Sequence, residues 1–247
     1  MLNFIRGDIY RLLRTRAFWI AELLILTLVV TDLLPGNEPS PTSAMAPAIN
    51  GLTAIDTNLN GKLLIYMLPL IIMILGSEYA KGTLKNLISS GISRSQYVLN
   101  KFASFGAVLF LQMALIAGLS FVTGSIIYRS TGIQEVTDIF NHLFYFFCVW
   151  FILMAIATVT LVVLYASKSI VLSILISLIF PFGILFFHLT HGDWEILKYL
   201  DLFTTLLNVT SSTLNDFTLI RPGLIGSLIT IIAGLFVADW IFKRQEY

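Results

Sequence analysis

Charged side chains are scarce in this sequence. Asp, Glu, Lys and Arg make up 12% of its 247 residues, whereas they make up about 25% of a typical soluble domain. Hydrophobic residues reach 57%, and 19 of the residues are phenylalanine. The net charge of +1 offers no basic surface for nucleic acid. The composition therefore excludes an ordinary soluble domain and a nucleic-acid partner, and it indicates a protein that is solvated by lipid.

Cysteine is almost absent, and so are the motifs of common catalytic sites. The single Cys148 lies in an apolar stretch, which excludes an intrachain disulfide framework and a cysteine-built zinc site. The sequence contains no Gly-x-x-x-x-Gly-Lys-Ser/Thr loop, no Gly-x-Ser-x-Gly elbow and no His-Glu-x-x-His helix. We therefore expect no catalytic residue, no cofactor and no metal site in this chain. An intramembrane enzyme is disfavoured, because all three histidines lie near the predicted outer boundary of the membrane.

Long apolar stretches dominate what is present. A transmembrane helix needs about 20 mostly apolar residues, because its backbone groups must be hydrogen-bonded within the bilayer. Six stretches qualify and predict an all-α, polytopic membrane protein with a single transmembrane domain. Their approximate ranges are 17–34, 62–77, 102–128, 143–165, 170–189 and 221–242. We interpret the first as a retained span rather than a cleaved signal peptide.

The basic residues predict the orientation of these spans. Eleven of the 15 Lys and Arg residues fall in segments that are cytoplasmic if the N-terminus is inside, and only Lys62, Arg129, Lys198 and Arg221 fall outside. Positive charges are retained on the cytoplasmic side of membrane proteins. We therefore expect both termini in the cytoplasm of a cell that is bacterial, with the protein in its plasma membrane.

Two segments outside the spans have amphipathic patterns. Residues 1–16 carry one apolar stripe and four arginines, which predicts a helix on the cytoplasmic membrane surface, or a plain anchor that binds anionic lipid. Residues 190–220 contain a second amphipathic pattern. It predicts a helix at the outer interface or one packed on the outer ends of the spans. The segment 35–61 begins with a proline-rich half that predicts an irregular outer loop.

The segment 78–101, between the second and third spans, predicts a short cytoplasmic helix. Thr83 can cap its start and Gly91 can end it. Ser93, with Gln96 three residues later, forms a capping box that starts the next helix. The short helix has an apolar patch of Leu84, Leu87 and Ile88. Because so short a helix is marginal alone, we expect lipid or a cytoplasmic partner protein to cover this patch.

This segment resembles the coupling region of the ABC type-2 permease family, the membrane subunits of ATP-driven exporters. The resemblance lies in an acidic residue that precedes a Gly-Thr turn and a short helix. The residues that carry the resemblance and the predicted contact with the ATPase are Glu78, Gly82, Thr83, Leu84, Lys85, Leu87, Ile88, Gly91, Ser93 and Arg94. The six predicted spans and the two amphipathic segments are similar to the same family. Most similar in character are the short permeases of lantibiotic and bacitracin immunity systems and of multidrug export.

The resemblance implies the partners of the chain. The short helix would be the coupling helix that sits in a groove of a cytoplasmic ATPase subunit, and that subunit would bind ATP and Mg²⁺. A second permease subunit, identical or homologous, would complete the transporter. The apolar composition favours an amphiphilic or hydrophobic cargo, such as an antimicrobial peptide, a drug or a lipid-linked molecule. This chain would then not be an enzyme.

A few polar residues lie inside the predicted spans, where they are costly and often functional. We expect Glu22 to reach the cytoplasmic interface or to pair with a basic side chain. Gln112, Thr158 and Thr160 are expected to form interhelical hydrogen bonds rather than to contact substrate. A secondary transporter or channel stays an alternative, because intraspan prolines occur at equivalent places in two three-span halves.

Overall fold

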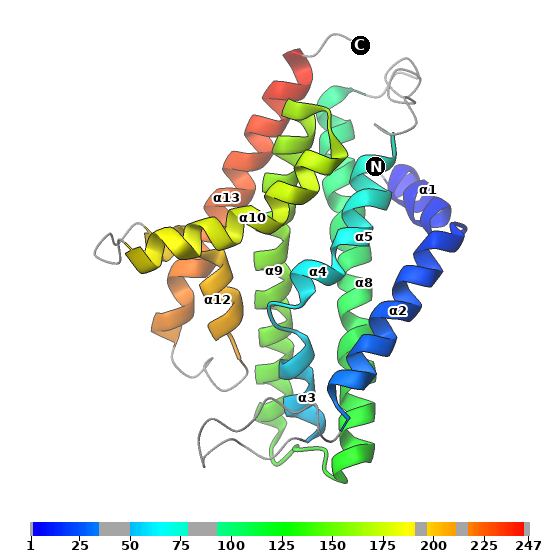
Figure 1. Cartoon of the computed structure of the whole chain (residues 1–247), viewed down its shortest axis with the longest axis vertical. Helices are drawn as coiled ribbons and strands as arrows, with labels where there is room; N and C mark the ends of the chain where they lie inside the picture. Colours follow the sequence, from blue (N-terminus) through cyan, green and yellow to red (C-terminus); the bar gives the residue numbers. More distant parts are fainter. Residues whose placement is uncertain (1, 35–49, 79–92, 191–196, 211–216, 245–247) are drawn as a thin grey trace.

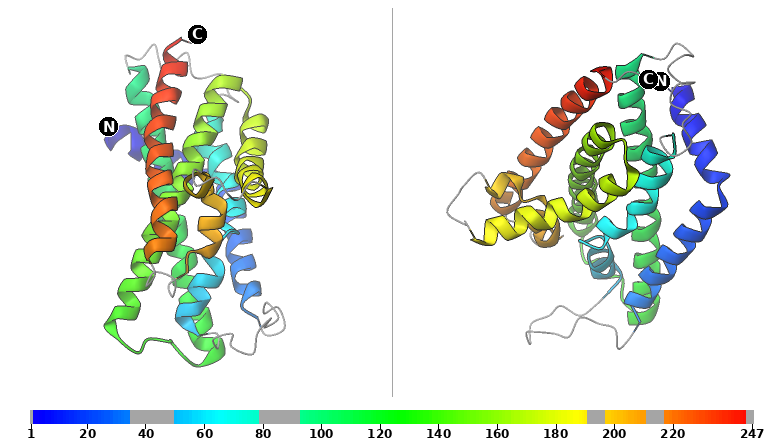
Figure 2. Two further views of the ribbon diagram at one scale, coloured as in Figure 1. Left: turned by 90° about the vertical axis from the view of Figure 1, so that its left-hand side faces the viewer. Right: turned by 45° about the horizontal axis from the view of Figure 1, so that its top comes forward.

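The computed structural model describes residues 2–34, 50–78, 93–190, 197–210 and 217–244. These residues form helices and connecting loops and include no strand, so the predicted all-α class is confirmed. The helices run mostly along the long axis of the molecule, and α9 (Val136–Ser167) lies near the centre (Figures 1 and 2). α1 and the last turns of α13 (Phe217–Arg244) lie toward the same end (Figure 1).

The chain begins with two helices that meet at a bend. α1 (Leu2–Leu13) is amphipathic, as predicted for residues 1–16, and α2 (Arg16–Asp32) covers most of the first predicted span. The backbone N–H of Thr15 donates to Leu12 O over 2.9 Å, so the turn is tight. Figure 1 shows α1 lying at an angle to the N-terminal end of α2, beside α8. A position of α1 on a membrane surface stays a prediction.

The second predicted span is broken into short helices. It consists of α4 (Leu63–Tyr66), α5 (Leu68–Leu70) and the π-helix η1 (Ile71–Gly76), and it is preceded by α3 (Gly51–Asn58). α3 was not predicted; the side chain of Asn50 caps it by accepting from Thr53 N–H over 3.0 Å. α3 and the helices at 63–76 meet at 64°. Pro69 lies at this irregular part, where its missing N–H interrupts regular α-helical bonding.

The two longest helices form the core of the fold. α8 (Arg94–Tyr128) starts at the predicted residue, where Ser93 Oγ accepts from Gln96 N–H over 3.3 Å, which is one of the two bonds of the predicted capping box. It has 35 residues and α9 has 32, which correspond to about 50 Å of helix each. Both therefore exceed the hydrocarbon thickness of roughly 30 Å. Most residues of the middle of α9 are buried, because helices pack on several of its sides.

The last part of the chain folds around α9. α10 (Ile170–Thr190) contains Pro181, and it is followed by α11 (Leu197–Leu200), α12 (Leu202–Asn208) and α13. Leu202, Phe203 and Leu206 of α12 are buried, and α12 contacts α9, α10 and α13. Of the two alternatives for the amphipathic segment, this burial favours a helix that packs on the spans.

The number of membrane spans differs from the prediction. Four helices of the described residues are long and apolar enough to cross a membrane, at Arg94–Tyr128, Val136–Ser167, Ile170–Phe187 and Ile220–Arg244. The bent pair of α3 and residues 63–76 gives a fifth if it is one broken span. The 17 residues of α2 measure about 26 Å, which is less than the hydrocarbon thickness. Six spans are therefore not confirmed, but a multi-pass membrane protein is.

Candidate functional site

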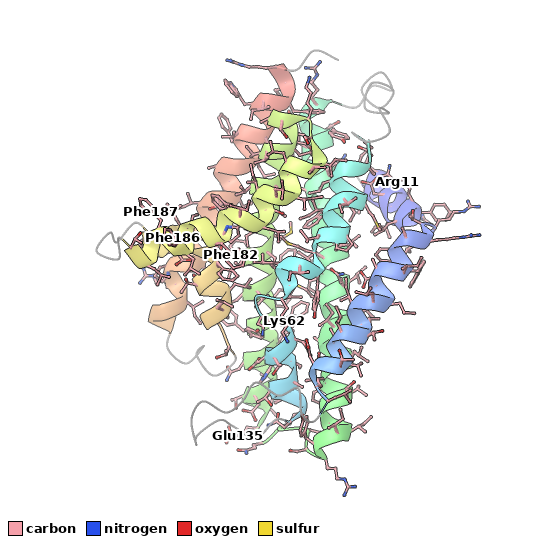
Figure 3. All side chains as sticks on the ribbon, in the orientation of Figure 1. Arg11, Lys62, Glu135, Phe182, Phe186 and Phe187 are labelled. Atoms are coloured by element: carbon pink, nitrogen blue, oxygen red, sulfur yellow. The ribbon has the colours of Figure 1, made fainter. Side chains whose placement is uncertain are left out.

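A cluster of buried charges joins α1, the end of η1 and α8. Lys101 of α8, only 1% exposed, places its ammonium nitrogen 2.8 Å from Asp8 Oδ2 and 2.6 Å from Glu78 Oε1. Arg11 of α1 lies 3.1 Å from Asp8 and 3.2 Å from Glu78. Figure 3 labels Arg11 on α1, far from Glu135 and Lys62. Two acids and two bases thus form one neutral cluster.

The geometry of the cluster explains how charges can be buried here. Removing a charge from water costs several kcal/mol, and this cost is offset only when opposite charges and hydrogen bonds surround it. Lys101 meets three carboxylate oxygens, since Asp8 Oδ1 also accepts over 3.0 Å. Its ammonium nitrogen lies 5.2 Å from the centre of the Phe4 ring and 5.8 Å from that of Tyr97, a distance at which aromatic faces attract cations.

Glu78 receives the largest share of these contacts. Its Oε1 accepts from Arg11 and Lys101, and its Oε2 accepts from the hydroxyl of Tyr97. Arg11 also donates to Ser77 Oγ over 3.1 Å, so α1 holds two consecutive residues. Glu78 is the last described residue before 79–92. The cluster therefore fixes the point at which the chain enters that segment.

The point at which the chain leaves the segment is held by different contacts. Arg94 donates to Lys243 O of α13 over 2.5 Å. Three residues later, the Tyr97 ring stacks on Phe242 at 5.2 Å between ring centres and 15° between planes. Phe242 in turn contacts Tyr165 of α9 at 4.9 Å. Both ends of residues 79–92 are thus attached to one region, where α1, α8, α9 and α13 meet.

The predicted site residues fall into two groups. Glu78, Ser93 and Arg94 are described. Ser93 caps α8 and Arg94 is its first residue, and Glu78 contacts the same helix through Tyr97 and Lys101. The predicted residues that lie outside the described part of the chain are Gly82, Thr83, Leu84, Lys85, Leu87, Ile88 and Gly91.

Sequence reasoning missed the partners of Glu78. Arg11 and Lys101 were considered only as determinants of orientation, and Asp8 and Tyr97 were not considered as site residues at all. One signal was available: Asp8 is the one acid among the four arginines of residues 1–16. A lone acid on an otherwise basic amphipathic helix suggests a specific cationic partner.

The polar residues inside the spans have partners of two kinds. Gln112 of α8 donates to Glu22 Oε1 of α2 over 2.7 Å and to Tyr66 O over 3.3 Å. Glu22 has no ion pair with a basic side chain among the described residues, so its partner is an amide. Thr158 and Thr160 donate to the carbonyls of Met154 and Ile156 on their own helix. Interhelical bonds were the wrong expectation for both threonines, because a helical threonine reaches the carbonyl four residues earlier.

The cluster consists of paired charges that connect α1 and α8 with Glu78. No group of three or more His, Cys, Asp or Glu side chains within the described ranges could hold a metal ion. The charges of the cluster neutralise one another, and their contacts span residues that are up to 93 positions apart. The cluster therefore ties Glu78, at the border of residues 79–92, to both α1 and α8.

Comparison with known proteins adds a family. Residues 5–184 match a family described as ABC-2 family transporter protein. The matched range begins in α1 and ends in α10, so it includes every residue of the charged cluster. A search of curated proteins finds no match.

Proposed function

The chain belongs to the ABC-2 transporter family, as a membrane permease, and on that premise we propose that it is the transmembrane subunit of an exporter. Membership implies association with an ABC ATPase. In our proposal a separate cytoplasmic ATPase supplies the energy, and the permease moves an amphiphilic or hydrophobic molecule outward. Antimicrobial peptides, drugs and lipid-like molecules fit the apolar composition, and a role in antibiotic resistance would follow from the first two.

The observation that carries this proposal is the buried cluster around Glu78. If the ATPase holds residues 79–92 and closes on ATP, it displaces Glu78, which carries Asp8, Arg11 and Lys101 with it. The ion pairs of Lys101 are shielded from water, and such contacts are electrostatically strong. The displacement therefore reaches α1 and α8 together, and the Arg94 contact passes it to α13. Tilting of these helices would open the outer side.

The exposed face of α10 supports a second permease subunit. Phe182, Phe186 and Phe187 are between 43% and 69% exposed, and Figure 3 shows them on the side of the bundle away from α2. A few spans enclose little space, so a second subunit that covers this face would complete the transporter. In this proposal the subunits are identical or homologous, both termini lie in the cytoplasm, and the membrane is the plasma membrane of a bacterium.

A coupling experiment tests the proposal. Replacing both Leu84 and Leu87 with Asp should abolish ATP-driven export, because carboxylates cannot enter an apolar groove of the ATPase without a large desolvation cost. The permease with its ATPase is reconstituted in liposomes, and export of a fluorescent amphiphile is measured after ATP addition.

The matched control puts the same two charges on the same short segment, as Asn86→Asp with Ser89→Asp. Export should then continue. Normal export by the Leu84→Asp, Leu87→Asp variant, in membranes that contain as much inserted permease as the wild type, would refute the proposed coupling.

A further inference from the structure

A large apolar cavity lies between α1, α2 and α8, apart from the charged cluster. Its volume is about 870 Å³, which lies within the range of about 300–1,000 Å³ that is usual for small-molecule sites. Leu12 of α1, Phe18 and Trp19 of α2, and Leu111 and Leu115 of α8 line it. These side chains form an apolar wall that suits a hydrocarbon or aromatic body.

One ionisable side chain interrupts this wall. Among the described residues that line the cavity, only Glu22 is ionisable, and it is 6% exposed. The two threonines that line the cavity use their hydroxyls on their own helix, where Thr27 donates to Leu23 O and Thr31 to Leu28 O. The polar character of the cavity therefore comes from Glu22 and its neighbour Gln112.

The two oxygens of Glu22 differ in their surroundings. Oε1 accepts from Gln112 Nε2 over 2.7 Å. Oε2 is buried and has no hydrogen-bond partner within the described residues. A buried carboxylate oxygen without a donor is costly, and the cost rises when no basic side chain lies nearby. A ligand that brings a cationic N–H group to this oxygen removes the cost.

We propose that this cavity binds a lipophilic amine, with its apolar body between α2 and α8 and its ammonium on the Glu22 carboxylate. Charge complementarity selects the cation, since the cavity offers one negative group on an otherwise apolar wall. An alcohol of the same size gains the apolar contact alone. The inference deepens the proposed function, on which it rests, by naming the class of cargo.

The rim of the cavity indicates how the amine arrives. Trp19 is 56% exposed, and Leu23 and Leu115 are exposed beside it. All three lie on helices α2 and α8, whose outer faces are apolar, so the cavity opens toward lipid rather than toward water. A lipophilic amine dissolved in the membrane can therefore enter sideways, and its ammonium reaches Glu22 inside the cavity.

Photolabelling of the purified full chain in lipid nanodiscs, without the ATPase, tests the site. The probes are a dodecylamine and a dodecanol that carry the same photoreactive diazirine. The amine should label peptides of α2 and α8 in the wild type. Glu22→Gln should weaken amine binding by at least about tenfold, since hydrogen bonds to charged groups are the strong ones, and it should leave alcohol binding unchanged.

Two controls separate charge from shape. Glu135→Gln makes the same chemical change on an exposed residue outside the cavity and should change neither probe. Ala114→Trp fills the cavity and should reduce the binding of both. Equal affinity of the wild type for amine and alcohol, or labelling that maps elsewhere, overturns the inference, and this comparison needs no variant to fold.

The binding assay and the export assay fail independently. Absence of amine binding in the nanodisc assay, with ATP-driven export intact, refutes the proposed amine site and agrees with the exporter function. Amine binding without export in the presence of ATPase and ATP refutes the proposed exporter function and agrees with the amine site.

Discussion

Lys101 is the most deeply buried charge of the cluster, and its removal should be the most damaging. Lys101→Met keeps most of the apolar stem of the side chain but leaves Asp8 and Glu78 with Arg11 as their one basic partner among the described residues. Removing one partner of a buried ion pair costs about 3–5 kcal/mol. We therefore expect the melting temperature of the purified protein to fall markedly. Thermal unfolding of the wild type and the variant measures this change.

Lys243→Met is the matched control for this prediction. Lys243 pairs with Asp239 over 2.6 Å, but its side chain is 54% exposed, and surface ion pairs contribute only about 0–1 kcal/mol. The control should unfold within a few degrees of the wild type. Equal losses for the two lysine variants would contradict the burial argument.

At the scale of residues, the sequence predicts a position more readily than a partner. Glu78 was identified because a resemblance places an acid before a Gly-Thr turn. Its contact with Arg11 joins residues that are 67 positions apart, and such a contact depends on how α1 docks against the bundle. No local pattern contains that information. The amide partner of Glu22, which is 90 positions away, was missed for the same reason.

At the scale of elements, the close approach of α3 to α8 makes a prediction about glycine. A Cβ added at Gly124 would lie 2.6 Å from Ala54 Cβ and 3.1 Å from Asn50 O, so one helix must shift. Overpacking of this kind costs about 1–3 kcal/mol. Gly124→Ala should therefore lower the melting temperature of the purified protein.

Replacement of Gly118, on the same helix, with alanine should change the melting temperature in the opposite direction. A Cβ there meets nothing within 4 Å, and alanine is favoured over glycine in a helix by about 0.5–1 kcal/mol. Gly118→Ala should raise the melting temperature slightly. If both variants shift in the same direction, α3 does not approach α8 as closely as described.

The helices themselves were predictable where the apolar stretches are long and uniform. Helices occur at all the predicted apolar stretches, and the Ser93 start of α8 was predicted from a capping pattern. α3 was missed because eight residues of mixed polarity after a proline-rich half give no sustained period. The π-helix η1 was missed because its wider turn depends on packing against other helices. The local sequence from Ile71 to Gly76 does not contain that information.

At the scale of the whole molecule, Tyr97 connects the charged cluster to α13. The Tyr97 hydroxyl donates to Glu78, and its ring stacks on Phe242 of α13. Tyr97→Phe keeps the stack and removes the donor. An unsatisfied buried oxygen costs about 1–3 kcal/mol, and we expect export per ATP hydrolysed to fall because Glu78 loses its direct bond to the residue that stacks on α13.

Tyr128→Phe supplies the comparison. Its hydroxyl donates to Leu33 O over 3.0 Å at the other end of α8, so the same atom is removed far from the cluster. That variant should lose stability to a similar degree and keep the ratio of export to ATP hydrolysis. A reduced ratio in both variants would show that the ratio follows stability rather than the link.

The pairing of Asp8 with Lys101 also sets an order for biosynthesis. These residues are 93 positions apart, so α1 cannot dock in its final place until the ribosome has released the first turns of α8. Until then Asp8 can pair with Arg11 of its own helix but lacks Lys101. Insertion of the first helices must therefore precede formation of the charged cluster. A nascent chain halted before residue 101 should retain an α1 that proteases can reach.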